Sequence, residues 1–311
     1  MLQLYSHNLQ FSQLQKEKIN SISIQTKSNM KLNLFFLSTA AMVNAASATD
    51  CTAAIDLGDA VEYAILSNAI STVPLSTITG DIAVTATSAS ITGFSLITAD
   101  IVVNHPIESN VRSSDYPQSI QVIGDVKASD FVEKYYVAGT ETQVTGDQAT
   151  ELTKAYKDME EAYVAAAACT TTKTLLDPNT NENRLDLKGQ TLYPGVYTFN
   201  AGVGITSGEV TFDGGNVPNA VFVIQVNGNF LQAAGTMVKL SGGALAKNIF
   251  WQVTGTVTVN GGATVGAHLE GIVLAKTAVT FITESSLNGR IFSQSMTPVA
   301  LGMATITQPP L

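Results

Sequence analysis

Threonine hydroxyls recur at alternate positions in the segment TGTVTV, which spans residues 254–259. In an extended chain Thr254, Thr256 and Thr258 would lie on one face, and the glycine and valines between them on the other. A threonine hydroxyl is neutral and both donates and accepts hydrogen bonds. This spacing therefore supports hydrogen bonding across a flat surface rather than the making or breaking of covalent bonds.

Groups that could carry catalysis are scattered along the chain. A carbohydrate-active enzyme needs carboxylates gathered in one groove, whereas Asp213, Glu270 and Glu284 lie far apart in the sequence. Beyond residue 48 the histidines are His105 and His268, and we expect His268 in a turn rather than on a metal. The sequence contains no Gly-x-Ser-x-Gly nucleophile motif. We therefore expect no enzyme activity, no metal site and no cofactor.

The composition predicts a strand-rich chain with an unusually neutral surface. Of the 311 residues, 45% are hydrophobic and 13% are charged, against about 25% charged in ordinary soluble domains. The formal net charge is −9, and residues 1–48 carry four lysines against one acid, so the remainder is more acidic still. This charge argues against nucleic acid or an anionic membrane as a partner.

The beginning of the chain resembles a targeting region. Residues 30–48 hold Lys31, an apolar run from Leu32 to Val43 and then small residues, which is typical of a secretory signal peptide. The run is shorter than the roughly 20 residues of a membrane span. We expect residues 1–29 to precede the true start, or to form a long n-region of the signal, and residues 49–311 to form one secreted, extracellular domain.

The cysteines are Cys51 and Cys169. In an exported protein a single pair allows one intramolecular connectivity, and we expect a disulfide, with two buried free thiols as the alternative. On the chain-entropy model such a long loop would stabilise the fold by up to roughly 5 kcal/mol.

One helix is predicted in an otherwise strand-like chain. Leu152, Tyr156, Met159 and Tyr163 recur at three- and four-residue intervals, which predicts an amphipathic helix from about 146 to 169. After Tyr193 every segment is strand-like and separated by glycine-rich turns.

Four strand-like segments repeat after residue 221. They begin at Phe222, Ile249, Val273 and Ile291, and they share polar positions that we align at Gln225, Gln252, Lys276 and Gln294. The segment YAILSNAIST, from Tyr63, matches IVLAKTAVTF and places Ser71 on Thr280. Such repeats predict a solenoid in which the beginning of the chain pairs with its end.

Stacked repeats would align the threonines of neighbouring strands. If Val257 and Val279 point inward, then Thr256, Thr258, Ala278 and Thr280 point outward. Stacked strands lie about 4.8 Å apart and alternate side chains about 6.7 Å apart. A rigid grid of methyl and hydroxyl groups at this spacing could hold ordered water.

Several stretches resemble the secreted microbial and algal ice-binding protein family. They are STVPLSTITGDIAV at 71–84, SASITGF at 88–94, LSGGALAKNIFWQV at 240–253, HLEGIVLAKTAVT at 268–280 and SLNGR at 286–290. The resemblance implies a mostly β fold: a right-handed, three-faced β-helix with one long α-helix packed alongside and the first rung docked next to the C-terminal rungs.

The resemblance also implies an ice crystal surface as the partner of a monomer, with no nucleic acid or membrane. The segment 277–280 fits a Thr-Ala-x-Thr pattern that some members carry, whereas Leu231 and Pro298 interrupt it. The expected ice-binding residues are Ser71, Thr206, Asn229, Thr254, Thr256, Thr258, Ala278, Thr280 and Ala300. The alternative is a cell-surface adhesin or structural β-helix module with the same architecture.

Overall fold

The structure, a computed structural model, divides the chain into two units, Met1–Ala48 and Thr49–Leu311. The described residues belong to the second unit, so the predicted segments 1–29 and 30–48 lie outside them. The backbone is described over residues 50–84, 91–97, 101–103, 121–122, 126–128, 135–137, 140–142, 148–176, 185–262 and 265–310.

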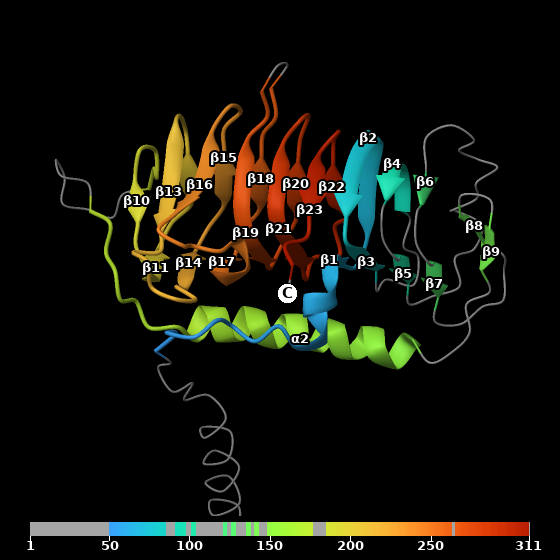
Figure 1. Cartoon of the computed structure of the whole chain (residues 1–311), viewed down its shortest axis with the longest axis horizontal. Coiled ribbons are helices and arrows are strands. Elements are labelled where there is room, and N and C mark those ends of the chain that lie inside the picture. Colours follow the sequence, from blue (N-terminus) through green and yellow to red (C-terminus); the bar gives the residue numbers. More distant parts are fainter. Residues whose placement is uncertain are drawn as a thin grey trace, which may run out of the picture. The chain divides into compact units, whose positions relative to one another are not determined.

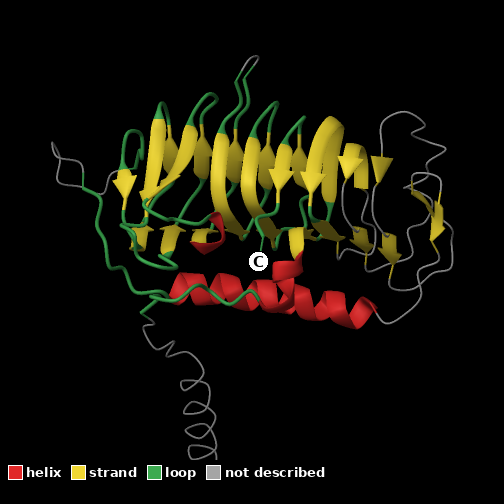
Figure 2. Ribbon diagram, viewed as in Figure 1, coloured by secondary structure: helices red, strands yellow, loops and turns green. Residues whose placement is uncertain are grey.

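Most described strands are short and parallel, and they stack in three series. Figures 1 and 2 show the strands of a series side by side along the long axis of the unit. Parallel strands require long crossover connections, and here each connection passes through the two other series before it returns. Each turn of the chain therefore adds one strand to every series, as in a solenoid.

The first series pairs segments from both ends of the unit. Its members, in stacking order, are β11 (Gly195–Phe199), β14 (Phe222–Val226), β17 (Ile249–Val253), β19 (His268–Ala275), β21 (Ser286–Ser293), β1 (Tyr63–Ser67), β3 (Asp81–Val84), β5 (Ile101–Val103) and β7 (Val126–Ala128). The N-terminal strand β1 thus pairs directly with β21, near the end of the chain.

The second series holds the strands in which the sequence predicts outward threonines. Its members are β12 (Val203–Ile205), β15 (Phe230–Gln232), β18 (Val257–Val259), β20 (Val279–Phe281), β22 (Val299–Leu301), β2 (Ile70–Thr79) and β4 (Ile91–Ile97).

Four long strands bend from one series into another, and one end of each belongs to the third series. Its own members are β10 (Thr191–Leu192), β13 (Glu209–Asp213), β16 (Met237–Ser241), β23 (Thr305–Thr307) and β6 (Gln121–Val122), joined by the ends of β19, β21, β2 and β4. Separately, β8 (Tyr135–Val137) and β9 (Thr140–Thr142) form an antiparallel pair.

Alternate residues of each series fill one shared interior. Trp251 is fully buried there, with its ring 4.7 Å from that of Phe230 and 5.7 Å from that of Phe212 between centroids. Its indole N–H donates to the Glu270 carbonyl at 2.9 Å, which satisfies the one polar group that this large side chain brings inside.

The helix α2 (Gln148–Ala168) packs along the outer side of the first series, as Figure 2 shows. Leu152, Met159 and Ala166 are buried against Val223 and Phe250 of that series, which confirms the predicted amphipathic helix. Among the described residues, no helix is both long and apolar enough to cross a membrane.

The predicted disulfide between Cys51 and Cys169 is present. It joins the segment before the short 3-10 helix η1 (Gly58–Glu62) to the end of α2. The side-chain amide of Gln225 also donates to the Cys169 carbonyl at 2.9 Å and to the Ala166 carbonyl at 2.8 Å. The end of the helix is thereby tied to the first series.

One predicted alignment is wrong. Gln225 does pair with Gln252, and Lys276 lies beside Gln294, but Gln252 pairs with Leu274, so Lys276 lies two residues out of register. The register here follows the burial of Val257 opposite Val279 and not the match between the polar residues Gln252 and Lys276. Because side chains alternate with a period of two, a slip of two residues leaves the inward and outward assignments unchanged.

Candidate functional site

The outward residues of the second series form one continuous column. In register across neighbouring strands, its members are Gly204, Leu231, Thr258, Thr280, Ala300 and Ser71. Thr258, Thr280, Ala300 and Ser71 were all expected at the site from sequence, and the fold brings them together on four consecutive strands. We call this set the central column.

A second line of residues runs beside the central column, one pleat earlier along each strand. It contains Asn229, Thr256 and Ala278, because Phe230 N–H donates to the Thr256 carbonyl and Val257 N–H to the Ala278 carbonyl. The Asn229 side-chain oxygen accepts from the Thr256 backbone N–H at 2.9 Å. This hydrogen bond holds the exposed amide in one orientation across two strands.

The two remaining expected residues lie at the edges of this surface. Thr254 follows β17 at the corner, and its hydroxyl donates to the Val226 carbonyl at 3.3 Å. Thr206 follows β12, and its hydroxyl donates to an Asp186 carboxylate oxygen at 2.6 Å. Burial would raise the pKa of Asp186, but the hydrogen bonds from Thr206 and Lys188 outweigh it and hold that pKa below its ordinary value.

The inward residues beneath the two lines anchor them rigidly. Val257 and Val279 are buried, as predicted, while Thr256 is exposed and Thr258 and Thr280 are partly exposed. The β-branched threonine side chain has few accessible rotamers in a strand. The hydroxyls and methyl groups are therefore held on fixed backbone rather than on flexible stems.

The surface is neutral but not uniform. No member of the central column carries a charge, whereas Leu231 stands 49% exposed between Gly204 and Thr258. A larger side chain at this position raises the surface above its neighbours. Leu231, which interrupts the Thr-Ala-x-Thr pattern in the sequence, thus lies inside the central column.

The third series differs in character, since its outward side chains include charged groups that bind one another. Lys239 pairs with Glu209 across two strands. His268 Nδ1 lies 2.8 Å from Ser286 Oγ, and His268 Nε2 lies 3.0 Å from Glu270 Oε1. The prediction that His268 lies in a turn is wrong, because it is the first residue of β19.

This contact between a serine, a histidine and a carboxylate is partly buried, with Glu270 9% exposed. The Ser286 backbone N–H donates to the Ala267 carbonyl at 2.8 Å, and Glu270 Oε2 accepts from Asn288 at 2.8 Å. His268 and Glu270 contact each other within β19, and their hydrogen bonds to Ser286 and Asn288 of β21 join the two strands. No group of three or more His, Cys, Asp and Glu side chains suited to a metal ion occurs in the described part of the chain.

Sequence reasoning missed one regular group of threonines. Within the third series, between β21 and β4, Thr77 pairs with Thr305 and Thr79 with Thr307, and the hydrophobic residues between them are buried. The two Thr-Ile-Thr segments lie near opposite ends of the chain, so only a comparison of those segments with each other could have found the pairing. We call these four residues the threonine square.

Known sequences resemble this chain over most of its length. An ice-binding protein of Leucosporidium sp. (strain AY30) is 38% identical over 258 residues, which cover 82% of this chain and 84% of that protein. An ice-binding protein of Flavobacterium frigoris (strain PS1) is 33% identical and covers 82% of this chain and 76% of its own length.

Solved structures resemble it in fold. An ice-binding protein from an Arctic yeast, described for its antifreeze activity, superposes with a TM-score of 0.59 at 32% identity and covers 83% of this chain and 95% of that one. The ice-binding protein of the Antarctic ascomycete Antarctomyces psychrotrophicus superposes with a TM-score of 0.58 at 23% identity, which supports the fold alone.

The model of the ice-binding-like family matches residues 65–307, which include every strand of the second series from β12 to β4. The chain therefore belongs to the ice-binding-like family.

Proposed function

We propose that this protein adsorbs to ice through the outward face of the second series and thereby inhibits ice growth and recrystallisation. The observation that carries the proposal is the unbroken neutral register from Leu231 through Thr258, Thr280 and Ala300 to Ser71, in a chain of this family. Adsorption involves no covalent chemistry, so we propose no enzymatic activity and no cofactor.

The physical basis is an ordered layer of water. Methyl groups of Thr256, Thr258 and Thr280 restrict the water around them, while their hydroxyls and the Asn229 amide anchor it. When this layer merges with an ice front, growth continues as curved bulges between adsorbed molecules, and curvature lowers the local freezing point. Rigid short side chains favour this, because each flexible side chain ordered on binding costs roughly 0.5–1.5 kcal/mol.

We also infer that the unit is a right-handed, three-faced β-helix whose first rung docks against the C-terminal rungs. The three series of parallel pairings and the pairing of β1 with β21 support this arrangement. Crossover connections between parallel strands are right-handed in about 98% of cases.

We propose that the protein is exported and acts outside the cell as a monomer, with residues 30–48 as the signal peptide. The disulfide supports export, since such bonds persist in oxidising compartments. Mass spectrometry of the protein from culture medium tests this: a mature chain starting after Ala45 or Ala48 is expected, and retention of residues 30–48 would contradict it.

The decisive experiment is growth of a single ice crystal in the purified chain 49–311. We expect a faceted crystal and a gap between the melting and freezing temperatures. Unshaped growth with no gap would overturn the proposed function. Ice that forms around a labelled protein should also incorporate it, whereas an adhesin for another surface would be excluded from the ice.

The threonine square is the competing ice-binding face. It is more regular than the second series, but it spans only β2 and β23 before the neighbouring column reaches Ser286 and then His268. We favour the second series because its neutral column extends across more strands. Substitutions on the two faces, described in the Discussion, distinguish them.

A further inference from the structure

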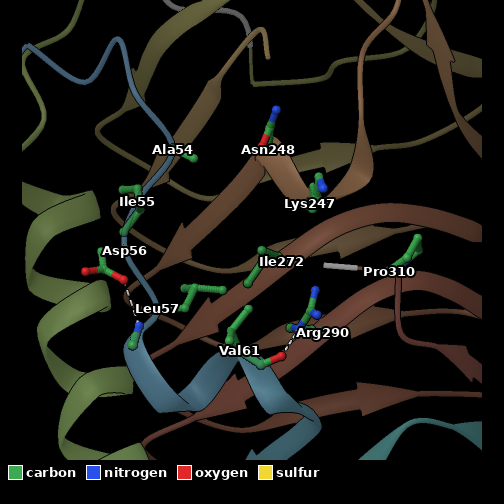
Figure 3. Close-up of a pocket in the computed structure, with 11 residues that line it drawn as sticks. Ala54, Ile55, Asp56, Leu57, Val61, Lys247, Asn248, Ile272, Arg290 and Pro310 are labelled. Atoms are coloured by element: carbon green, nitrogen blue, oxygen red, sulfur yellow. Dashed lines mark hydrogen bonds between the residues drawn. The ribbon is translucent and has the colours of Figure 1, made fainter.

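A pocket of about 500 Å³ lies on the side of the first series, between the N-terminal segment and the corner of β19 and β21. It takes no residue from the central column or from the threonine square. Figure 3 shows the segment 54–58 on one side and Lys247, Arg290 and Pro310 on the other. Its lining residues are therefore outside the proposed ice-binding surface.

Arg290 brings a buried cation to this pocket. Its side chain is 1% exposed, and its Nε and Nη2 donate to the carbonyls of Val61 at 2.9 Å and Pro309 at 3.2 Å. Both acceptors are neutral, and within the described residues no carboxylate oxygen lies within ion-pair distance of the guanidinium. A buried charge is normally paired, so this cation lacks the partner that would stabilise it.

The remaining guanidinium hydrogens have no acceptor among the described residues. Five N–H bonds are available on arginine, and the hydrogen bonds to the Val61 and Pro309 carbonyls use two of them. Burial lowers the pKa of Arg290, while the charge of Glu62 works in the opposite direction. An anion placed in the pocket would satisfy the free donors and offset the cost of burying the charge.

Two further donors stand above Arg290. Lys247 and Asn248 belong to the short 3-10 helix η2 (Ala246–Asn248) and line the same pocket. Asn248 is 5% exposed, and its Nδ2 is a buried donor with no partner within the described residues. The pocket thus combines a guanidinium and an ammonium group, while the Asn248 amide nitrogen points away from Arg290 in Figure 3.

The rest of the lining is mostly apolar. It includes Ile55, Leu57, Val61, Ile272 and Pro310. The one acid is Asp56, which lies well away from Arg290 in Figure 3 and accepts the Gly58 backbone N–H at 2.9 Å. A ligand that fits this lining carries a negative head and an apolar body.

We propose that this pocket binds a small organic carboxylate, with its carboxylate group between Arg290 and Lys247 and its apolar body against Leu57 and Ile272. The planar guanidinium matches the geometry of a carboxylate, and a cavity of this volume is within the range of small-molecule sites. Inorganic phosphate would meet the same donors but would leave the apolar walls uncovered.

The test is a calorimetric titration of the chain 49–311 with phenylacetate as the probe. We expect saturable binding with one site per chain. Phenylacetamide, which has nearly the same shape but no charge, should bind at least roughly 10-fold more weakly, as should inorganic phosphate. Equal binding of phenylacetamide, or no binding of phenylacetate, would overturn the proposal.

Two variants and a control separate binding from folding. Lys247→Glu should weaken phenylacetate binding by roughly 10-fold or more, since an attractive charge becomes a repulsive one. Lys173→Glu makes the same charge change at an exposed lysine outside the pocket and should bind phenylacetate as the unsubstituted chain does. Equal affinity of the Lys247→Glu and Lys173→Glu variants would contradict the site.

Arg290→Gln tests the buried cation itself. We expect phenylacetate binding to be lost, with a lower melting temperature because the backbone contacts at Val61 and Pro309 change. If Arg290→Gln folds and binds phenylacetate with unchanged affinity, Arg290 is only a structural clamp and the proposal fails. Ice shaping by Lys247→Glu should be unchanged, so a failure here is distinguishable from a failure of the proposed function.

One rival occupant is internal. Leu311 follows the lining residue Pro310 and lies outside the described residues. A variant extended by Gly-Ser-Gly-Ser after Leu311 moves any terminal carboxylate away. If only the extended chain binds phenylacetate, the pocket belongs to the chain's own terminus and the proposal of a separate ligand is overturned; equal binding by both chains supports it.

Discussion

Ser71 lies directly opposite Ala300 in parallel register, although the two residues come from near the beginning and the end of the described chain. The neighbouring pair, Ile70 and Val299, is fully buried, and the Val299 N–H donates to the Ala69 carbonyl at 2.8 Å. The central column therefore continues from the C-terminal strands onto an N-terminal one. The extent of the proposed ice-binding face depends on this long-range pairing.

Replacing threonines of the second series should reduce ice activity. Thr256→Tyr and Thr280→Tyr each place a large ring on the surface and disturb the ordered water, so we expect most of the gap between melting and freezing to disappear. Both positions point outward, and the free energy of unfolding should change by no more than about 0.5 kcal/mol. Nanolitre osmometry and thermal melting of the same samples measure the two effects.

The matched control lies on the other face. Thr305→Tyr and Thr307→Tyr make the same change in the threonine square and should leave the gap unchanged. If these variants lose activity while Thr256→Tyr and Thr280→Tyr keep it, the threonine square is the ice-binding face and the assignment to the second series is wrong.

Replacing the exposed leucine of the central column should raise activity. Leu231→Thr aligns a third threonine with Thr258 and Thr280 and lowers the raised point on the surface. We expect a larger freezing gap at the same protein concentration. Leu231→Lys should instead reduce it, because a flexible charged side chain disorders the adjacent water. An equal response of the two variants would show that Leu231 lies outside the contact.

Removing the disulfide should cost stability without removing the ice-binding face. A variant with both Cys51→Ser and Cys169→Ser frees the N-terminal segment from the end of α2, and the free energy of unfolding should fall by about 2–5 kcal/mol. Guanidinium denaturation measures the loss. Below its lowered melting temperature the variant should still shape ice; loss of shaping in a folded variant would show that the bond also positions the second series.

Protonation of Asp158 at low pH should lower the free energy of unfolding. Burial works to raise its pKa, but the hydrogen bonds from Lys154 and the Asp59 backbone outweigh it, and the pKa is lowered. A carboxylate whose pKa is lowered by folding stabilises the folded state at pH values above its ordinary pKa, which is near 3.9. That stabilisation is lost as the pH falls through the lowered pKa of the folded state.

The corresponding variant is Asp158→Asn. It should destabilise the protein at pH 7 by at most about 1 kcal/mol, the upper range for an exposed ion pair, and this difference should shrink towards zero as the pH is lowered below about 4. Glu160→Gln removes an exposed carboxylate from the same helix and is the control for net charge. A destabilisation that stays constant down to low pH would contradict the role of the carboxylate.

Local pattern determined several features of this protein. The spacing of Leu152 and Met159 predicted the helix, the alternation around Val257 predicted which side chains are inward, and the single cysteine pair predicted the disulfide. Each of these depends on a period of 3.6 or 2 residues or on a single possible connection. Neighbours along the chain carry that information, so tertiary structure was not needed to find it.

Only the tertiary structure decided how the rungs align and which contacts the segments near the two ends of the described chain make with each other. These contacts join distant segments: Gln252 pairs with Leu274 rather than with Lys276, Thr77 and Thr79 pair with Thr305 and Thr307, and Arg290 is buried beside Val61. A solenoid tolerates loops of different lengths between rungs, so spacing in sequence does not determine register. Register follows from which hydrophobic residues meet in the interior, and that is settled when the coils stack.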